Sequence, residues 1–215
     1  MSAKEPTPPP GSDTIAIPDI LPVLPLKDVV LFPYVIVPLS ISREKSIAAV
    51  DAALAEQRIL LLVAQRDSSV EEPGPTDLFP VGTAAAVMRM LKLPDGRIRL
   101  LVQGLSRMRI DSFVADAPAL RAKVSRVAEP DAADPRSEET EALVRAVKEA
   151  LEKTVSLGKQ ISPEVMVVAA GLDEPARLAD LAASNLELKV DEAQKVLETI
   201  PVSYTHLTLP TILLV

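Results

Sequence analysis

The 215-residue chain has no cysteine, no tryptophan and a single histidine, and only 2% of its residues are aromatic. Without cysteine, a disulfide framework, a thiolate nucleophile and a cysteine-rich zinc site are all excluded. So few aromatic side chains leave little material for the stacking platforms that bind nucleic-acid bases. The net charge of -7 also argues against a protein that gains affinity by neutralising phosphates. What remains is an acidic protein with an aliphatic core.

The sequence also lacks the signatures of catalysis. No G-x-x-x-x-G-K-[ST] phosphate-binding loop occurs, so we expect neither ATP hydrolysis nor a cofactor in this chain. We expect no metal site, because there are no cysteines and the sole histidine, His206, lies in a carboxyl-terminal stretch unlike the rest of the sequence. Ser46 beside Lys45 is better explained as exposed helix surface than as a catalytic pair, because adjacent helical residues point apart. These absences predict a chain without catalytic residues.

Long apolar runs are missing as well. No segment approaches the ~20 apolar residues that a membrane-spanning helix requires, and the amino terminus has no apolar core of signal-peptide length. We therefore expect a cytoplasmic protein. Residues 1–19 combine several prolines with Gly11 and Ser12, which predicts a disordered leader. Beyond it, hydrophobic residues at 48% and charged residues at 25% of the chain are typical of globular domains.

Residues 20–128 have the pattern of a mostly antiparallel β unit. Short apolar runs predict strands at residues 21–26, 29–32, 35–39, 59–64, 108–114 and 120–127. Pro25, Pro33 and Pro38 favour sheet edges or strand ends, because proline cannot donate a ladder hydrogen bond. One amphipathic helix, capped by Ser42 and ending near Gln57, interrupts the strands.

Residues 136–200 have a helical pattern. This pattern predicts a second domain, a small helical bundle, after a linker at residues 130–135. Apolar residues recur every four positions after Ser137, which opens the first helix. Ser162 and Pro163 form a cap and first-turn pair, Gly171 ends that helix, and Asp173 with Pro175 opens the next. The predicted fold class is therefore α+β.

The clearest hairpin joins residues 81–93 to residues 98–102 through a Pro-Asp-Gly turn. A three-residue loop places Lys92 opposite Ile98 and Met90 opposite Leu100. One side then carries Met88, Met90, Ile98, Leu100 and Val102, and the other carries Arg89, Leu91, Leu93, Arg97, Arg99 and Leu101. The second side mixes leucine with arginine, which suits weak binding of apolar chains with acidic flanks. Packing of these leucines against a neighbouring element is an equally good explanation.

Arg43, Glu44 and Lys45 form a second candidate binding site at the start of the predicted helix. Three charged residues in an exposed turn can contact a substrate or a neighbouring subunit. A solvated surface is the simpler explanation, because exposed charges contribute little on their own.

The residues from Pro22 onward resemble the start of the Lon family of ATP-dependent proteases. The family pattern joins PVLPL, a basic-acidic step, FP, and PL before REKS, and here it occupies residues 22–46. The resemblance continues through LLVAQRD, EEPGPTDLFPVGT and MLKLPDGRIRLLVQGLSRMRI, and later through ISPEV and DEPARLADLAASNLEL. These motifs occur in the family order and extend from about Ile20 to Ile200.

The resemblance implies a PUA-like β pseudo-barrel with one inserted helix, followed by a small helical bundle. It implies the amino-terminal, substrate-recognition region of a homohexameric, cytoplasmic protease that degrades misfolded and regulatory proteins. The AAA+ and Ser-Lys protease domains, with their ATP and Mg, are expected downstream of this region. The implied partners are unfolded or tagged proteins, with no membrane or nucleic acid.

Two alternatives stay open beside this interpretation. The first is a standalone binding protein with the same β domain and no protease, although the helical region also matches the longer family. The second is an RNA-binding PUA-like module, against which the acidity and the few aromatic residues count.

The chain ends in a stretch unlike the rest of the sequence. Residues 202–211, VSYTHLTLPT, have no Asp, Glu, Lys or Arg and abandon the preceding helical pattern. They resemble an in-frame translation of a sequencing adapter, and we treat residues 202–215 as an artefactual tail. A genuine carboxyl-terminal strand is the alternative.

Overall fold

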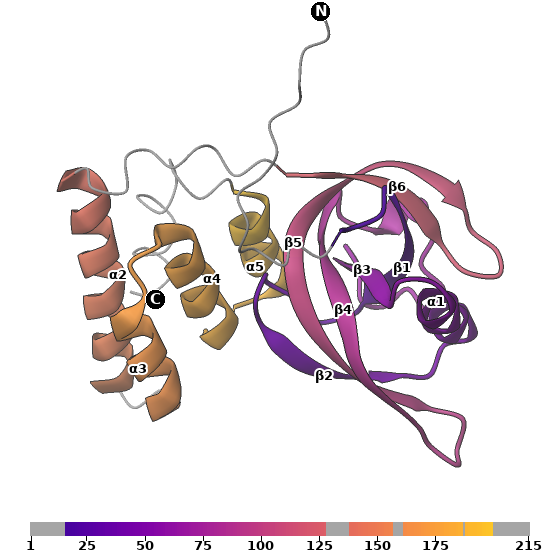
Figure 1. Cartoon of the computed structure of the whole chain (residues 1–215), viewed down its shortest axis with the longest axis horizontal. Helices are drawn as coiled ribbons and strands as arrows, with labels where there is room; N and C mark the ends of the chain where they lie inside the picture. The colour runs from indigo at the N-terminus through magenta and orange to yellow at the C-terminus, as the bar shows by residue number, and fades with distance from the viewer. Residues whose placement is uncertain (1–15, 128–137, 157–160, 187, 200–215) are drawn as a thin grey trace, which may run out of the picture.

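The computed structural model describes residues 16–127, 138–156, 161–186 and 188–199. A β part occupies one side of the molecule, and helices lie beside it on the other (Figure 1). Most of the expected leader, the linker, Ser137 and the tail at residues 202–215 lie outside the described residues. The proposed domain boundary between residues 128 and 136 therefore stays a prediction.

The first described elements are strands with one α-helix among them, and the later elements are all helices. The β part contains β1 (Ile20–Leu26), β2 (Ile36–Ile41), α1 (Glu44–Ala55), β3 (Ile59–Ala64), the 3-10 turn η1 (Pro75–Asp77), β4 (Val81–Lys92), β5 (Ile98–Ala115) and β6 (Arg121–Arg126). The helical part contains α2 (Glu138–Ser156), α3 (Pro163–Gly171), α4 (Pro175–Asn185) and α5 (Val190–Glu198). This arrangement confirms the predicted α+β class.

The six strands form one sheet in the order β2-β5-β4-β3-β1-β6, and an additional pairing of β5 with β6 closes it into a barrel. All pairings are antiparallel except that of β1 with β3. β2 and β6 pair with different halves of β5, so β2 extends the barrel wall beyond the closed ring. The mostly antiparallel pseudo-barrel is therefore confirmed.

The 18-residue strand β5 was predicted as two separate strands, and this prediction is wrong. Gly104 stands within the strand rather than in a break between strands. A Cβ atom at this position would collide with the carbonyl oxygen of Phe32. Glycine is therefore needed here because another backbone segment approaches closely, not because the chain turns.

That neighbouring segment was also predicted incorrectly, because residues 29–32 do not form a strand. The chain instead turns at Pro33 and Tyr34, and Tyr34 has a left-handed backbone with φ of 65°. The Tyr34 N–H donates to Gly104 O at 2.9 Å, and the Gly104 N–H donates to Val35 O at 2.9 Å. The prediction for Pro38 is confirmed, because β2 is the end strand of the sheet.

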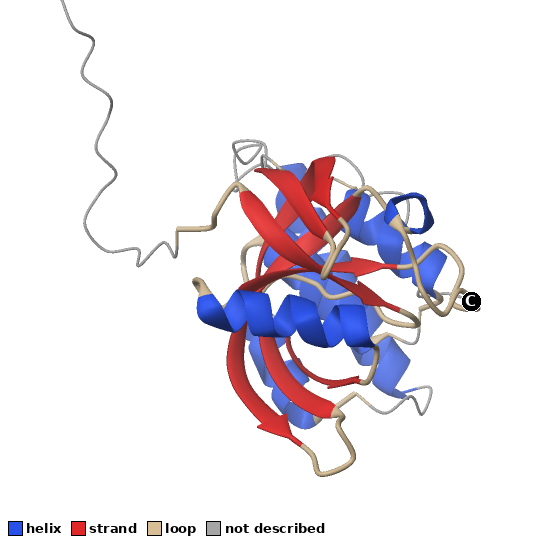
Figure 2. Ribbon diagram, turned by 90° about the vertical axis from the view of Figure 1, so that its right-hand side faces the viewer, coloured by secondary structure: helices blue, strands red, loops and turns tan. Residues whose placement is uncertain are grey.

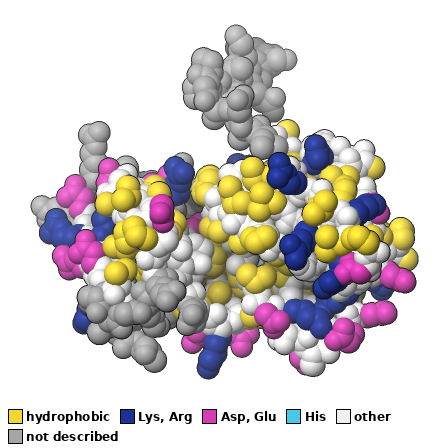
Figure 3. All heavy atoms as spheres, turned by 90° about the horizontal axis from the view of Figure 1, so that it is seen from below, with side chains coloured by type: hydrophobic (Ala, Val, Ile, Leu, Met, Phe, Trp, Pro, Cys, Tyr) yellow, Lys and Arg dark blue, Asp and Glu magenta, His cyan; other side chains and the backbone are white. Residues whose placement is uncertain are grey.

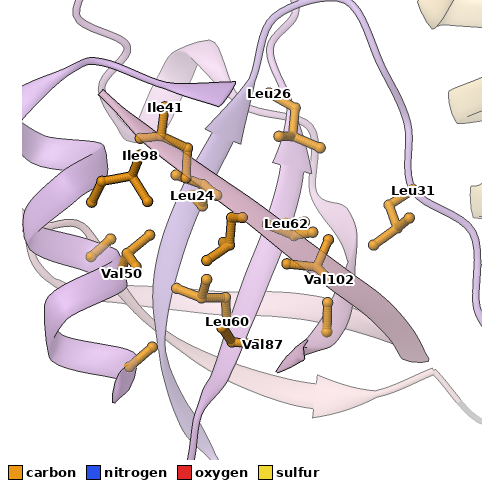
Figure 4. Close-up of a cluster of buried hydrophobic side chains, with 14 of the residues drawn as sticks. Leu24, Leu26, Leu31, Ile41, Val50, Leu60, Leu62, Val87, Ile98 and Val102 are labelled. Atoms are coloured by element: carbon orange, nitrogen blue, oxygen red, sulfur yellow. The ribbon is translucent and has the colours of Figure 1, made fainter. Parts of the chain in front are cut away.

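The core of the β part lies on both faces of β3, whose six residues are all buried. Leu60 and Leu62 point into one cluster of aliphatic side chains, and Ile59, Leu61 and Val63 point into another. Figure 4 shows the first cluster, in which side chains from several strands converge with Val50 of α1. Helix α1 lies across the strands and covers this cluster (Figure 2). Burial on both faces explains why β3 is a continuous apolar run.

Two predicted helix starts differ from the structure by one residue. The N-cap of α1 is Arg43 rather than Ser42, and it makes no side-chain capping bond. The N-cap of α4 is Glu174 rather than Asp173. The cap at Ser162 is confirmed, because its hydroxyl accepts from the Val165 N–H at 3.4 Å.

The serine and lysine at the start of α1 differ in exposure. Ser46 was predicted to be exposed but is buried, because it lies on the inner face of α1, whereas Lys45 is exposed.

A buried polar cluster joins the helical part to the barrel. Arg107 of β5 pairs with Asp180 of α4, and each side chain is only 3% exposed. The Arg107 Nη1 donates to Asp180 Oδ2 at 3.0 Å, and its Nε donates to Leu197 O, near the end of α5, at 3.1 Å. Gln194 of α5 adds a bond from Nε2 to Val81 O at 2.9 Å. Apolar side chains of both parts, including Phe32, also pack together in one cluster.

Candidate functional site

The face of β2, β5 and β4 that points away from the core carries the first predicted site. The strand register places Pro38 beside Leu101 and Leu101 beside Arg89. One step towards the hairpin turn, the next row on the same face contains Ser40, Arg99 and Leu91. One step the other way, the row contains Ile36, Gln103 and Ala86. The register therefore brings Arg89, Leu91, Arg99 and Leu101 together, as the alternation of the hairpin predicted.

Several apolar side chains on this face are about half exposed. The exposed fractions are 50% for Ile36, 56% for Leu91 and 49% for Met88, while Leu101 is partly buried. We call the residues Ile36, Pro38, Met88, Arg89, Leu91, Arg99 and Leu101 the outer patch. Figure 3 looks from below Figure 1, the side on which β2 and the end of the hairpin lie. It shows hydrophobic side chains spread over the β part with Lys and Arg among them.

Met88 was predicted on the same side of the hairpin as Met90, Ile98, Leu100 and Val102, and this prediction is wrong. The pairing of β4 with β5 shifts register between Val87 and Arg89, so Met88 is an extra residue in the ladder. Such a bulge turns a side chain away from the strict alternation. The core position opposite Val102 is taken by Val87, which is 5% exposed.

Leu93 and Arg97, also predicted for this site, lie at the turn beyond the paired rows. The Leu93 N–H donates to Arg97 O at 2.8 Å and closes the turn. The Arg97 side chain forms an ion pair of 2.6 Å with Asp95. Hydrogen bonds from Arg97 hold the pKa of the Asp95 carboxyl below its usual value. Arg97 therefore already has an acidic partner within the turn.

The second predicted site, Arg43, Glu44 and Lys45, lines a cleft of 410 Å³ at the start of α1. The Arg43 Nη1 donates to Gln65 Oε1 at 2.8 Å, and Gln65 itself is buried. The Arg43 Nη2 is buried without a hydrogen-bond partner among the described residues. At the rim, an ion pair of 2.8 Å between Lys27 and Glu71 lowers the pKa of the Glu71 carboxyl. The cleft is lined by two cations, Arg43 and Lys45, and by three carboxylates, Glu44, Glu71 and Glu72, so its charges do not favour an anionic ligand.

Sequence reasoning missed the contribution of β2 to the outer patch. The pattern IVPLSI alternates, so that Ile36, Pro38 and Ser40 share one face and Val37, Leu39 and Ile41 share the other. This alternation was the available signal, but it does not show which strand lies next to β2. The pairing with β5 is a long-range contact that only the folded structure provides.

Within the described residues, no three or more His, Asp or Glu side chains are grouped so that they could hold a metal ion. None of the described helices combines the length and apolar character needed to cross a membrane.

Comparison with known proteins identifies relatives along most of the chain. Residues 20–204 match the family model described as ATP-dependent protease La (LON) substrate-binding domain. The Lon protease of Geobacter metallireducens is 52% identical over 189 residues, which is 88% of this chain and 23% of the relative. The Lon protease of Escherichia coli K12 is 44% identical over 178 residues, which is 83% of this chain and 22% of the relative. The chain thus spans less than a quarter of these relatives' length.

Solved structures agree with the fold. The N-terminal domain of Mycobacterium avium complex Lon protease superposes with a TM-score of 0.68 and 25% identity, covering 90% of this chain and 95% of that one. The Lon N-terminal domain protein from Xanthomonas campestris, at 18% identity, has a TM-score of 0.59, covers 85% of this chain and 92% of that one, and supports the fold alone. The chain therefore belongs to the family of ATP-dependent protease La (LON) substrate-binding domains.

Proposed function

We propose that this chain is the substrate-recognition region of a longer ATP-dependent protease, and that its outer patch holds apolar segments of non-native proteins. The observation that carries the proposal is the group of half-exposed apolar side chains, Ile36, Met88 and Leu91, on a paired sheet. Contiguous exposed apolar surface with polar neighbours is typical of interaction sites. The sheet holds these side chains in place before a partner arrives, which reduces the entropy lost on binding.

The chemistry of the longer protein belongs outside this chain in our proposal. ATP with Mg and a Ser-Lys protease site act downstream, in a cytoplasmic homohexamer that degrades misfolded and regulatory proteins. The outer patch then raises the local concentration of substrate near the domains that unfold and cleave it. The relatives are called Lon protease and are about four times longer than the matched region. Their length favours this role over that of a standalone binding protein.

The proposal is tested by binding of a chemically unfolded protein to the 215-residue chain. The variant combines Ile36→Ser with Leu91→Ser, which removes apolar surface without opening the core. Losing roughly 0.8 kcal/mol for each buried methylene-sized group predicts an affinity at least about tenfold lower. Fluorescence anisotropy with a labelled unfolded protein measures this change, and circular dichroism confirms that the fold is retained.

The matched control is Val167→Ser on α3, because Val167 is 74% exposed and lies outside the outer patch. This control is expected to bind like the unchanged chain. If the double variant also bound with unchanged affinity, the outer patch would not be the substrate site.

A further inference from the structure

We propose that the outer patch selects extended segments in which a carboxylate stands two residues away from an apolar side chain. This inference rests on the proposed function and specifies the chemistry of the substrate. It comes from the positions of Arg89 and Arg99 among the apolar residues of the patch.

Leucine and arginine alternate along both strands of the hairpin and also across them. Leu101 lies opposite Arg89, and Arg99 lies opposite Leu91, so each row pairs one leucine with one arginine. The two arginines are diagonal neighbours, as are the two leucines. Diagonal side chains on one face are within reach of each other when they are long. The patch therefore has the pattern of a checkerboard rather than an apolar stripe bordered by charges.

The two arginines of the outer patch have no acidic partner within ion-pair distance among the described residues, unlike other cations of the hairpin. Arg97 pairs with Asp95 at 2.6 Å, and Lys92 pairs with Asp51 at 3.3 Å. Arg89 and Arg99 are both exposed, and every ion pair of the described residues joins other side chains. Two like charges on diagonal positions repel each other, and a carboxylate from a partner relieves that repulsion.

The spacing of the patch matches that of an extended chain. Side chains on one face of a strand repeat every second residue, about 6.5 Å apart. An extended segment lying along β5 meets Leu101 and then Arg99, and one lying along β4 meets Leu91 and then Arg89. Because these strands are antiparallel, the patch offers the apolar-then-basic order in both directions. A segment can therefore bind whichever way its chain runs, provided that the two-residue spacing is kept.

The test compares three labelled peptides with the same apolar residues and either Ser, Glu or Lys two positions after each. Binding to the 215-residue chain is measured by fluorescence anisotropy at low salt. We expect the Glu peptide to bind about three- to tenfold more tightly than the Ser peptide, since exposed ion pairs contribute modestly. The Lys peptide is expected to bind more weakly than the Ser peptide. In 1 M salt, where the Debye length is about 3 Å, the preference should largely vanish.

Two variants connect this preference to the patch. The double variant with Arg89→Gln and Arg99→Gln is expected to lose the preference for the Glu peptide over the Ser peptide, while the Ser peptide still binds. Arg109→Gln is the matched control, because Arg109 is an exposed arginine of β5 that lies outside the outer patch, in the half of the strand away from the hairpin turn. The control should keep the full preference. A preference that survived the double replacement would overturn the inference.

The outcomes separate this inference from the proposed function. If the Ser and Glu peptides bound equally well to the unchanged chain, the inference would be wrong and the proposed function would stand. If no peptide bound, the proposed function would fail with it. If sedimentation showed a dimer that Leu91→Ser dissociates, the patch would be an interface between copies of this chain, and both would be overturned.

Discussion

Arg107 links the barrel to the helices through hydrogen bonds to both α4 and α5. Burying a guanidinium and a carboxylate costs several kcal/mol for each ion, and their attraction offsets this only with good geometry and further hydrogen bonds. Arg107 meets both conditions through its two-nitrogen contact with Asp180 and its bond to Leu197 O. The carbonyl it binds lies near the end of α5, where helix carbonyls lack partners within the helix.

Replacing one member of this pair is therefore expected to be more damaging than replacing both. Arg107→Ala leaves the Asp180 carboxylate buried without its main partner and should lower the free energy of unfolding by about 3–5 kcal/mol. The double change Arg107→Met with Asp180→Leu should lower it less than Arg107→Ala does. Urea denaturation measures the free energy of unfolding of both variants, and a double variant less stable than Arg107→Ala would argue against a coupled pair.

Single residues also mark where the sequence is informative and where it is not. The pairing of Met90 with Leu100 and of Lys92 with Ile98 was predicted from the Pro-Asp-Gly turn and is confirmed. The position of Met88 was predicted wrongly because nothing in the local sequence reveals a bulge. Alternation along a strand is a local property, whereas a bulge depends on the register with its partner.

Among the elements, those with strong local patterns were predicted well. Strand β3 matches the predicted residues 59–64 because its apolar run is short, continuous and bounded by polar residues. Strand β5 was predicted as two strands, at residues 98–102 and 108–114, although it runs unbroken through Gly104. The reason for that glycine, the close approach of Phe32, comes from a segment far away in the chain. The pairing of β2 with β5, which completes the outer patch, is long-range in the same sense.

The contacts between elements also bear on how independent the two predicted domains are. Helix α5 packs on the barrel through Val196 and Leu197, which share a cluster with Phe32 and Val81. Helix α4 contributes Ala183 to this cluster and Leu178 to another that includes Val147 of α2. Helix α4 therefore connects the barrel to α2 and α3, and α4 with α5 forms a continuation of the barrel core.

A fragment limited to residues 20–127 is consequently expected to be less stable than the whole chain. It exposes Phe32 and Val81 and leaves Arg107 without its carboxylate, which predicts a loss of about 3–5 kcal/mol. Thermal and urea unfolding of the fragment and of the whole chain measure this difference. Equal stability of the two would show that the barrel folds independently of the helices.

At the scale of the whole molecule, the outer patch and the helical docking surface lie on different parts of β5. The half of β5 that pairs with β2 carries Arg99 and Leu101, and Arg107 towards the other half contacts α4 and α5. The barrel thus presents one surface for a partner while another holds the helices. In the proposed protease, β5 therefore connects the surface that binds a segment to the surface that holds the helices.

Site-specific photo-crosslinking tests the central claim, binding of non-native chains at the outer patch, most directly. A photoreactive amino acid is placed at Leu91 in one variant and at Val167 in another, and each is irradiated with a chemically unfolded protein. Both positions are exposed, at 56% and 74%, so chance encounters alone would crosslink position 167 at least as much as position 91. The account predicts strong crosslinks from position 91 and weak ones from position 167. Equal crosslinking from both positions, or more from position 167, would contradict it.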